Sequence, residues 1–102
     1  MTWNQKDKDL IKQEVAALLR GEPEVRKVVV FGSFLNRVDP NDLDVAVFQD
    51  TDETYLPLAL KYRRLLRPVA ARIPLDVIPV RAGVAGGQFL REIERGEVVY
   101  EG

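Results

Sequence analysis

The sequence predicts an α/β or α+β fold in which helices flank one small sheet. Three apolar runs of strand length alternate with segments whose apolar residues recur at helical spacing, and glycine or proline separates most of them. The predicted order is helix, strand, turn, strand, helix, strand, helix. The chain has 102 residues, which suits a single domain over residues 1–102, and 46% of them are hydrophobic, which allows a real core.

The first expected elements are an amphipathic helix and a buried strand. The helix is predicted over Asn4 to Arg20, where apolar residues recur every three or four positions. Gly21 is the expected C-cap, and Pro23 blocks any continuation of the helix. The apolar run Lys27 to Phe31 then predicts a strand that ends at a Gly-Ser dipeptide.

The middle of the chain predicts a connector, a strand and a helix. Phe34 to Asn41 has room for one helical turn, and Leu43 to Phe48 predicts the second strand. Asp50 to Glu53 are expected to cap a helix over Thr54 to Ala71. Pro68 lies inside that helix and predicts a kink or an early end, because proline lacks the N–H group that a helix interior requires.

The last third predicts a strand, a short helix and an extended end. Leu75 to Val80 is the third strand, and Pro79 favours an edge position or an early end because it cannot donate to a neighbouring strand. Gly86-Gly87 precede a helix predicted over Gln88 to Arg95. Glu97 to Tyr100 is expected as a final extended piece.

Composition excludes several kinds of site. The chain has no cysteine and no histidine, so disulfides, thiolate catalysis, imidazole bases and His or Cys metal sites are excluded. The net charge of -1 does not indicate nucleic-acid or membrane binding. The polar N-terminus does not resemble a signal peptide, and no apolar run reaches the length of a membrane span. A cytoplasmic protein is expected.

Three aspartates stand at the starts of apolar runs. Asp42 and Asp44 lie two residues apart, so in a strand they project from the same face. Asp76 opens the third strand and is available as a third carboxylate. Neighbouring carboxylates repel each other unless a proton or a cation lies between them, and oxygen ligands favour hard cations such as Mg²⁺ or Mn²⁺. A metal site is therefore predicted, with room for the two-metal arrangement used in displacement at phosphorus.

Gly32 and Ser33 follow a predicted strand and precede the connector. Glycine allows a phosphate to approach the backbone closely, and serine adds a hydroxyl donor. The segment lacks the Gly-Lys-Ser/Thr of a Walker loop, so a P-loop nucleotide site is excluded.

The run Val30 to Ser33, followed by Asp42 to Val47, resembles the signature of the DNA polymerase β-like nucleotidyltransferase superfamily. Leu75 to Ile78 looks like the strand that carries the third carboxylate of that superfamily. The closing residues Phe89 to Glu101 are similar to the end of the minimal nucleotidyltransferase (MNT) group. The resemblance covers Val28 to Glu101, nearly the whole chain, and implies a small mixed sheet with flanking helices.

The resemblance also implies a chemistry and a role for each residue. It implies transfer of a nucleoside monophosphate, usually AMP from ATP, to a hydroxyl with the help of two Mg²⁺ ions. Gly32 and Ser33 would hold the triphosphate, and Asp42 and Asp44 would bind both ions. Asp76 would bind the ion that activates the acceptor hydroxyl and would assist its deprotonation.

A partner is implied as well. MNT proteins often pair with a helical HEPN protein as antitoxin and toxin, and in known cases the MNT protein adenylylates a tyrosine of the HEPN ribonuclease. A homo- or hetero-oligomer is therefore expected. The chain departs from many antitoxin members in having Leu35-Asn36-Arg37 after the serine and Asn41 where serine is frequent.

Alternatives remain open at this point. The same fold would also serve as a non-catalytic module that binds a nucleotide or a toxin, or as an enzyme acting on a small molecule such as an aminoglycoside. Arg37 is interpreted as a surface loop cation rather than a phosphate ligand, and Trp3 as a packing residue. A basic stretch is either a solvated helix face or a docking surface for RNA or an acidic partner. It consists of Lys61, Arg63, Arg64, Arg67 and Arg72.

Overall fold

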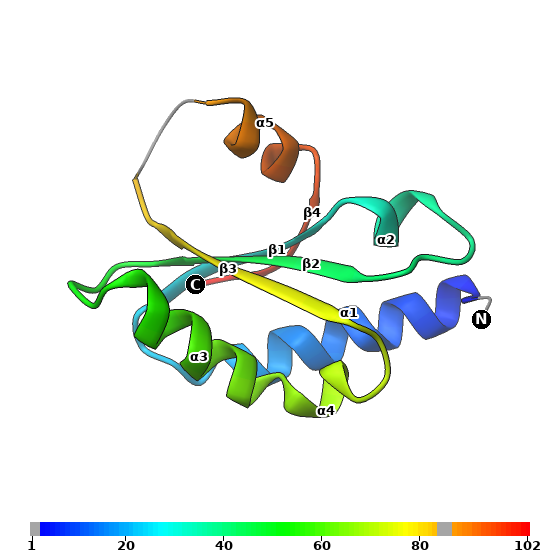
Figure 1. The fold of residues 1–102 in the computed structure, drawn as a ribbon, viewed down its shortest axis with the longest axis horizontal. Helices are drawn as coiled ribbons and strands as arrows, with labels where there is room; N and C mark the ends of the chain where they lie inside the picture. The colour runs from blue at the N-terminus through cyan, green and yellow to red at the C-terminus, as the bar shows by residue number, and fades with distance from the viewer. Residues whose placement is uncertain (1–2, 84–86) are drawn as a thin grey trace.

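The computed structural model of the chain describes residues 3–83 and 87–102. Figure 1 shows a sheet with α1, α3 and α4 on one side and α5 on the other. The helices are α1 (Gln5–Leu19), α2 (Ser33–Asn36), α3 (Tyr55–Leu65), α4 (Arg67–Ala70) and α5 (Gln88–Glu94). The strands are β1 (Val25–Phe31), β2 (Leu43–Gln49), β3 (Leu75–Arg81) and β4 (Glu97–Glu101).

The four strands form one mixed sheet in the order β3-β2-β1-β4. β1 is antiparallel to both β2 and β4, whereas β2 and β3 are parallel. The predicted fold class is therefore confirmed. β3, which contains Pro79, is an edge strand, so the edge position expected from this proline is confirmed. An edge strand tolerates proline because only one of its two sides pairs with another strand.

The sheet buries its two faces unequally. Leu43, Val45 and Val47 of β2 belong to the large cluster that also contains residues of α1, α3 and α4. The opposite face holds a smaller cluster in which Ala46 of β2 meets Ile93 of α5. The short helix α5 packs on this second face but does not cover all of it. The first residues of β2 and β3 therefore stay accessible on this face.

Helix α1 begins as predicted but ends differently. The Asp7 amide donates to the Asn4 side chain over 2.8 Å, and the Asn4 amide donates back to Asp7 over 3.4 Å, which forms a capping box. The C-cap is Arg20 in the right-handed helical region, and Gly21 does not adopt a positive φ. The prediction that Gly21 caps the helix was wrong, because the chain leaves α1 through a turn that needs no left-handed residue.

The second long helix divides at its proline. α3 ends at Leu65 and α4 starts at Arg67, with Pro68 in the first turn of α4, so the early end predicted from this proline is confirmed. The prediction that residues 50–53 cap α3 was wrong. The N-cap is Thr54, and Asp50 is held instead by an ion pair with Arg26 at 2.8 Å.

The remaining predicted elements are present. The connector contains the helical turn α2, and the extended end forms β4 at the second edge of the sheet. Gly86 lies outside the described residues, and Gly87 is the N-cap of α5. Across residues 3–83 and 87–102, none of the helices combines the length and apolarity that a membrane span requires.

Candidate active site

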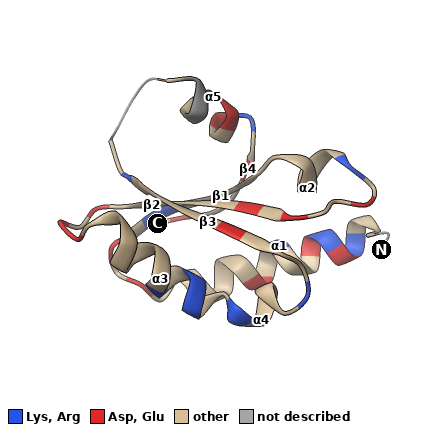
Figure 2. Cartoon of the chain, in the orientation of Figure 1, with Lys and Arg blue, Asp and Glu red and all other residues tan. Residues whose placement is uncertain are grey.

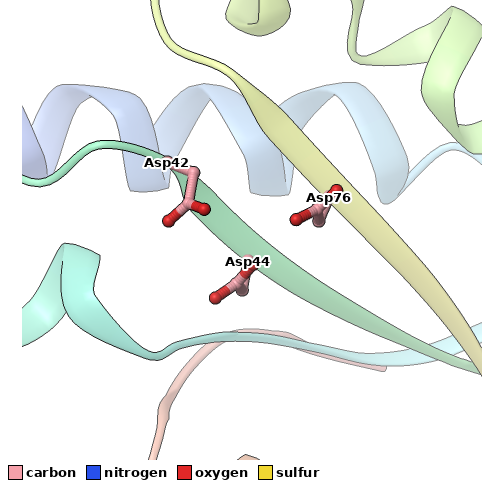
Figure 3. A group of neighbouring side chains, drawn as sticks. All are labelled: Asp42, Asp44 and Asp76. Atoms are coloured by element: carbon pink, nitrogen blue, oxygen red, sulfur yellow. The ribbon is translucent and has the colours of Figure 1, made fainter.

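Three carboxylates converge at one end of the sheet, on the face that α5 leaves open. Asp42 immediately precedes β2, Asp44 is the second residue of β2, and Asp76 is the second residue of β3 (Figure 3). The parallel register places Asp44 directly beside Asp76. One oxygen from each of the three side chains lies within 4.8 Å of the others. The structure therefore brings together all three aspartates that the sequence singled out.

The cluster carries unbalanced negative charge. Partial burial, together with the charges of Asp42 and Asp76, raises the pKa of Asp44 to about 6. Within the described part of the chain, no lysine or arginine forms an ion pair with any of the three. Such a group of carboxylates is stable in its charged form only when a cation balances it.

The donor set fits a divalent cation. All three side chains offer carboxylate oxygens, which Mg²⁺ prefers. Ligands on opposite sides of Mg²⁺ lie about 4.2 Å apart, twice the usual Mg–O distance. The three carboxylate oxygens lie no more than 4.8 Å apart, which is close to this distance of about 4.2 Å between opposite ligands. Small side-chain movements are therefore enough for the three to coordinate one ion.

Gly32 lies against the carboxylate of Asp44. Phe31, the last residue of β1, is the register partner of Asp44, so the chain leaves the sheet directly beside the cluster. Gly32 has a φ of 81°, and a Cβ atom placed there would lie 2.6 Å from Oδ2 of Asp44. Any side chain would therefore strain the backbone and collide with the carboxylate, so this position requires glycine.

Ser33 begins α2 and faces the cluster. Its hydroxyl lies 3.4 Å from Oδ1 of Asp42, to which it donates a weak hydrogen bond. Gly32 and Ser33 thus lie beside two of the three carboxylates, Asp44 and Asp42. Arg37, at the end of α2, is exposed and lies 3.7 Å from Asp39, as expected for a surface loop cation.

The start of α1 fixes the position of α2. Trp3 and Phe34 are both buried and pack edge to face, with ring centroids 5.7 Å apart, which confirms Trp3 as a packing residue. The Trp3 amide donates to the Val38 carbonyl over 3.0 Å. The buried Lys8 ammonium donates to the Arg37 carbonyl and lies over the Phe34 ring.

Sequence reasoning missed Lys8 as a supporting residue of the site. A signal for it existed, because Lys8 lies on the stripe of α1 that Ile11, Val15 and Leu19 bury at helical spacing. A charged residue on a buried stripe implies a polar partner inside the fold. The identity of that partner, a backbone carbonyl of the connector, becomes visible only in the folded chain.

Known proteins share both the sequence pattern and the architecture. The family model described as "Polymerase beta, Nucleotidyltransferase" matches residues 13–102. Among solved structures, a complex of tri-AMPylated HEPN toxin with MNT antitoxin from Shewanella oneidensis is similar, with 21% identity and a TM-score of 0.61 over 93% of this chain and 73% of that chain.

Two further solved structures are similar at the level of the fold. The toxin–antitoxin complex MntA–HepT matches with 20% identity and a TM-score of 0.58, over 92% of this chain and 73% of that chain. A toxin–antitoxin structure with AMP-PNP matches with 20% identity and a TM-score of 0.61, over 89% of this chain and 73% of that chain. No curated protein sequence matches the chain.

The family match carries more weight than these structural likenesses, because identities near 20% show the fold alone. It spans nearly all of the chain and includes Gly32, Ser33 and the three aspartates. The chain belongs to the polymerase beta nucleotidyltransferase family.

Proposed function

We propose that this protein is a Mg²⁺-dependent nucleotidyltransferase that transfers AMP from ATP to a hydroxyl of a HEPN-type partner protein, and thereby acts as its antitoxin. The convergence of three unbalanced carboxylates beside Gly32 is the observation that carries the proposal. The family membership supports the reaction class. The similar structures of an MNT antitoxin with an AMPylated HEPN toxin, and of a toxin–antitoxin with AMP-PNP, support the nucleotide and the partner.

Each residue has a proposed role. Asp42 and Asp44 would hold two Mg²⁺ ions, and Asp76 would be a further ligand of one of them. Bound there, Mg²⁺ would supply a lower pKa for the acceptor hydroxyl and positive charge to balance the triphosphate. Gly32 keeps the backbone beside Asp44 free of side-chain atoms, which leaves space for phosphate oxygens, and the Ser33 hydroxyl donates a hydrogen bond to one of them.

The proposed reaction is a displacement at the α-phosphorus of ATP. The acceptor oxygen forms a bond to this phosphorus, the bond from the phosphorus to the oxygen that bridges to the β-phosphate breaks, and pyrophosphate leaves. The proton of the acceptor hydroxyl passes to Asp76, which is the most exposed of the three carboxylates, and then to water. AMP remains attached to the partner through a phosphodiester.

Label transfer tests the proposal. The protein is incubated with ATP labelled at the α-phosphate, Mg²⁺ and the HEPN-type product of a neighbouring gene. The wild type is expected to transfer label to the partner, and Asp44→Asn is not. The control Asp52→Asn, which removes a fully exposed carboxylate, is expected to transfer label as the wild type does. Absence of transfer by the wild type, or equal transfer by Asp44→Asn, would contradict the proposal.

The alternative of a non-catalytic binding module is separated in cells. The double variant Asp42→Ala/Asp44→Ala is co-expressed with the partner toxin, and growth is compared with that of cells containing the wild type. The proposed reaction predicts loss of neutralisation, since both ligands of the shared metal site are absent. Full neutralisation by the double variant would show that occupancy alone silences the toxin.

A further inference from the structure

The outer side of α3 and α4 carries a surface that the proposed reaction does not use. We call it the α3 face and define it as Leu56, Leu60, Arg63, Arg64 and Arg67. The two leucines are 64% and 53% exposed, although leucine is usually buried. Figure 2 shows the basic residues of α3 and α4 on the side of the sheet that these helices share with α1. The acidic residues of β2 and β3 lie in the sheet itself.

The arginines of the α3 face are free to bind a partner. Arg63, Arg64 and Arg67 are exposed, and none forms an ion pair or a side-chain hydrogen bond with any residue in the two described ranges. Lys61 differs, because it binds Glu22 at 2.8 Å and Glu24 at 2.9 Å, and these contacts raise its pKa. Lys61 therefore holds α3 to the chain before β1 and does not belong to the α3 face.

The surface is hollowed rather than flat. Leu60, Arg63, Arg64, Arg67 and Ala70 line a groove of about 400 Å³ along the two helices. Leu56 lies one helical turn before Leu60 and extends the same side of α3. Leu56 and Leu60 thus precede the three arginines along one side of the two helices, and the groove itself begins at Leu60.

We propose that the α3 face docks an acidic amphipathic helix of a partner protein. A helix laid along the groove would pack apolar side chains on Leu60 and, beyond the end of the groove, on the exposed Leu56. It would set carboxylates against the three arginines, whose guanidinium groups bind carboxylates in a bidentate manner. Nucleic acid fits less well, because phosphates gain nothing from exposed leucines and the chain has a net charge of -1.

The docking surface is separate from the carboxylate cluster. α3 packs on the face of the sheet from which Val45 and Val47 project (Figure 1). Asp44 projects from the opposite face. A helix bound to the α3 face therefore leaves the cluster open to a nucleotide. The proposal does not rest on nucleotidyl transfer, since binding is measured without ATP.

A designed peptide tests the docking. The probe is a fluorescein-labelled helical peptide with leucines along one stripe and glutamates flanking it, titrated with the full chain and followed by anisotropy. The variant Arg63→Ala/Arg64→Ala/Arg67→Ala is expected to bind about tenfold more weakly than the wild type, from three exposed charge pairs. The matched control Arg20→Ala/Arg91→Ala/Arg95→Ala removes three exposed arginines elsewhere and is expected to change affinity less than about twofold.

Further arms make each outcome decisive. Changing the glutamates of the peptide to lysine is expected to abolish binding without any change in the protein. Several results would overturn the proposal: no saturable binding of the acidic peptide, equal binding of a peptide with the same composition in scrambled order, or tighter binding of a single-stranded RNA that is lost in the same triple variant. Self-association that disappears in Leu60→Glu would assign the groove to a second copy of the chain and overturn it as well.

Discussion

Replacing Asp44 with asparagine should stabilise the metal-free protein. In the folded chain the pKa of Asp44 is about 6, because of burial and the charges of Asp42 and Asp76, whereas its ordinary value is 3.8. The folded state therefore holds the proton more tightly than the unfolded state does. As the pH rises from about 4 to 6, the unfolded chain ionises first, so the free energy of unfolding falls over this window. Asparagine has no such ionisation.

The size of the effect follows from the pKa difference. A rise from 3.8 to about 6 corresponds to about 3 kcal/mol of disfavoured ionisation at neutral pH. Because the carboxylate is only partly buried, solvent screening reduces this to about 1–1.5 kcal/mol. For a domain of this length, that free energy corresponds to a rise in Tm of about 5–10 °C.

The assay is thermal unfolding followed by circular dichroism, with EDTA present, for the wild type, Asp44→Asn and the control Asp52→Asn. At about pH 7.5 only Asp44→Asn is expected to melt at a higher temperature, and at about pH 3.5 most of this gain should vanish, because Asp44 is then protonated in the folded state and mostly protonated in the unfolded state. Millimolar Mg²⁺ should raise the Tm of the wild type and have little effect on Asp44→Asn.

The reasoning fails if Asp44→Asn melts at or below the wild-type temperature at about pH 7.5 without metal. In that case the three carboxylates would not repel one another in the folded chain. A gain that persists in full at about pH 3.5 would also contradict it, because asparagine would then stabilise the fold through packing rather than through charge.

Three further predictions address contacts around the site and in the core. Gly32→Ala should lower the free energy of unfolding by about 2–3 kcal/mol and abolish AMP transfer, because its Cβ would lie 2.6 Å from Oδ2 of Asp44 at a positive φ. Lys8→Met should cost about 1–2 kcal/mol, since the part-buried hydrogen bond from Lys8 to the Arg37 carbonyl is lost, and should raise the KM for ATP more than it lowers kcat. Tyr62→Phe should cost about 1–1.5 kcal/mol, because the buried Tyr62 hydroxyl donates to Glu24 over 2.8 Å. Urea unfolding and steady-state kinetics measure these effects.

Matched controls exist for each of these variants. Gly21→Ala adds a methyl group where no atom lies within 4 Å, and Lys6→Met and Tyr55→Phe change exposed side chains of the same types. Each control should stay within about 0.5 kcal/mol of the wild type. If a control loses as much stability as its paired variant, the specific contact is not the cause.

The order of the elements and much of the site were accessible from sequence because they depend on local patterns. Alternation along an extended chain predicts that Asp42, just before β2, and Asp44, within it, project from one face. Likewise, Pro68 ends α3 and Pro79 marks an edge strand, because both effects come from a missing N–H group. The predictions that Gly21 caps α1 and that residues 50–53 cap α3 were wrong. The geometry of a helix end depends on the direction in which the adjoining chain runs, which is set by the tertiary fold.

The sequence by itself determined which residue types were available: no histidine or cysteine, three aspartates at strand starts, and a Gly-Ser turn. The tertiary structure decided which of them meet. Parallel pairing of β2 with β3 places Asp76 beside Asp44, and packing of α1 against α2 assigns Lys8 to the connector, 29 residues away. Such pairings join distant segments, so they follow from burial of the whole sheet rather than from any local pattern. The same burial raises the pKa of Asp44 and makes the cluster a site that favours a cation.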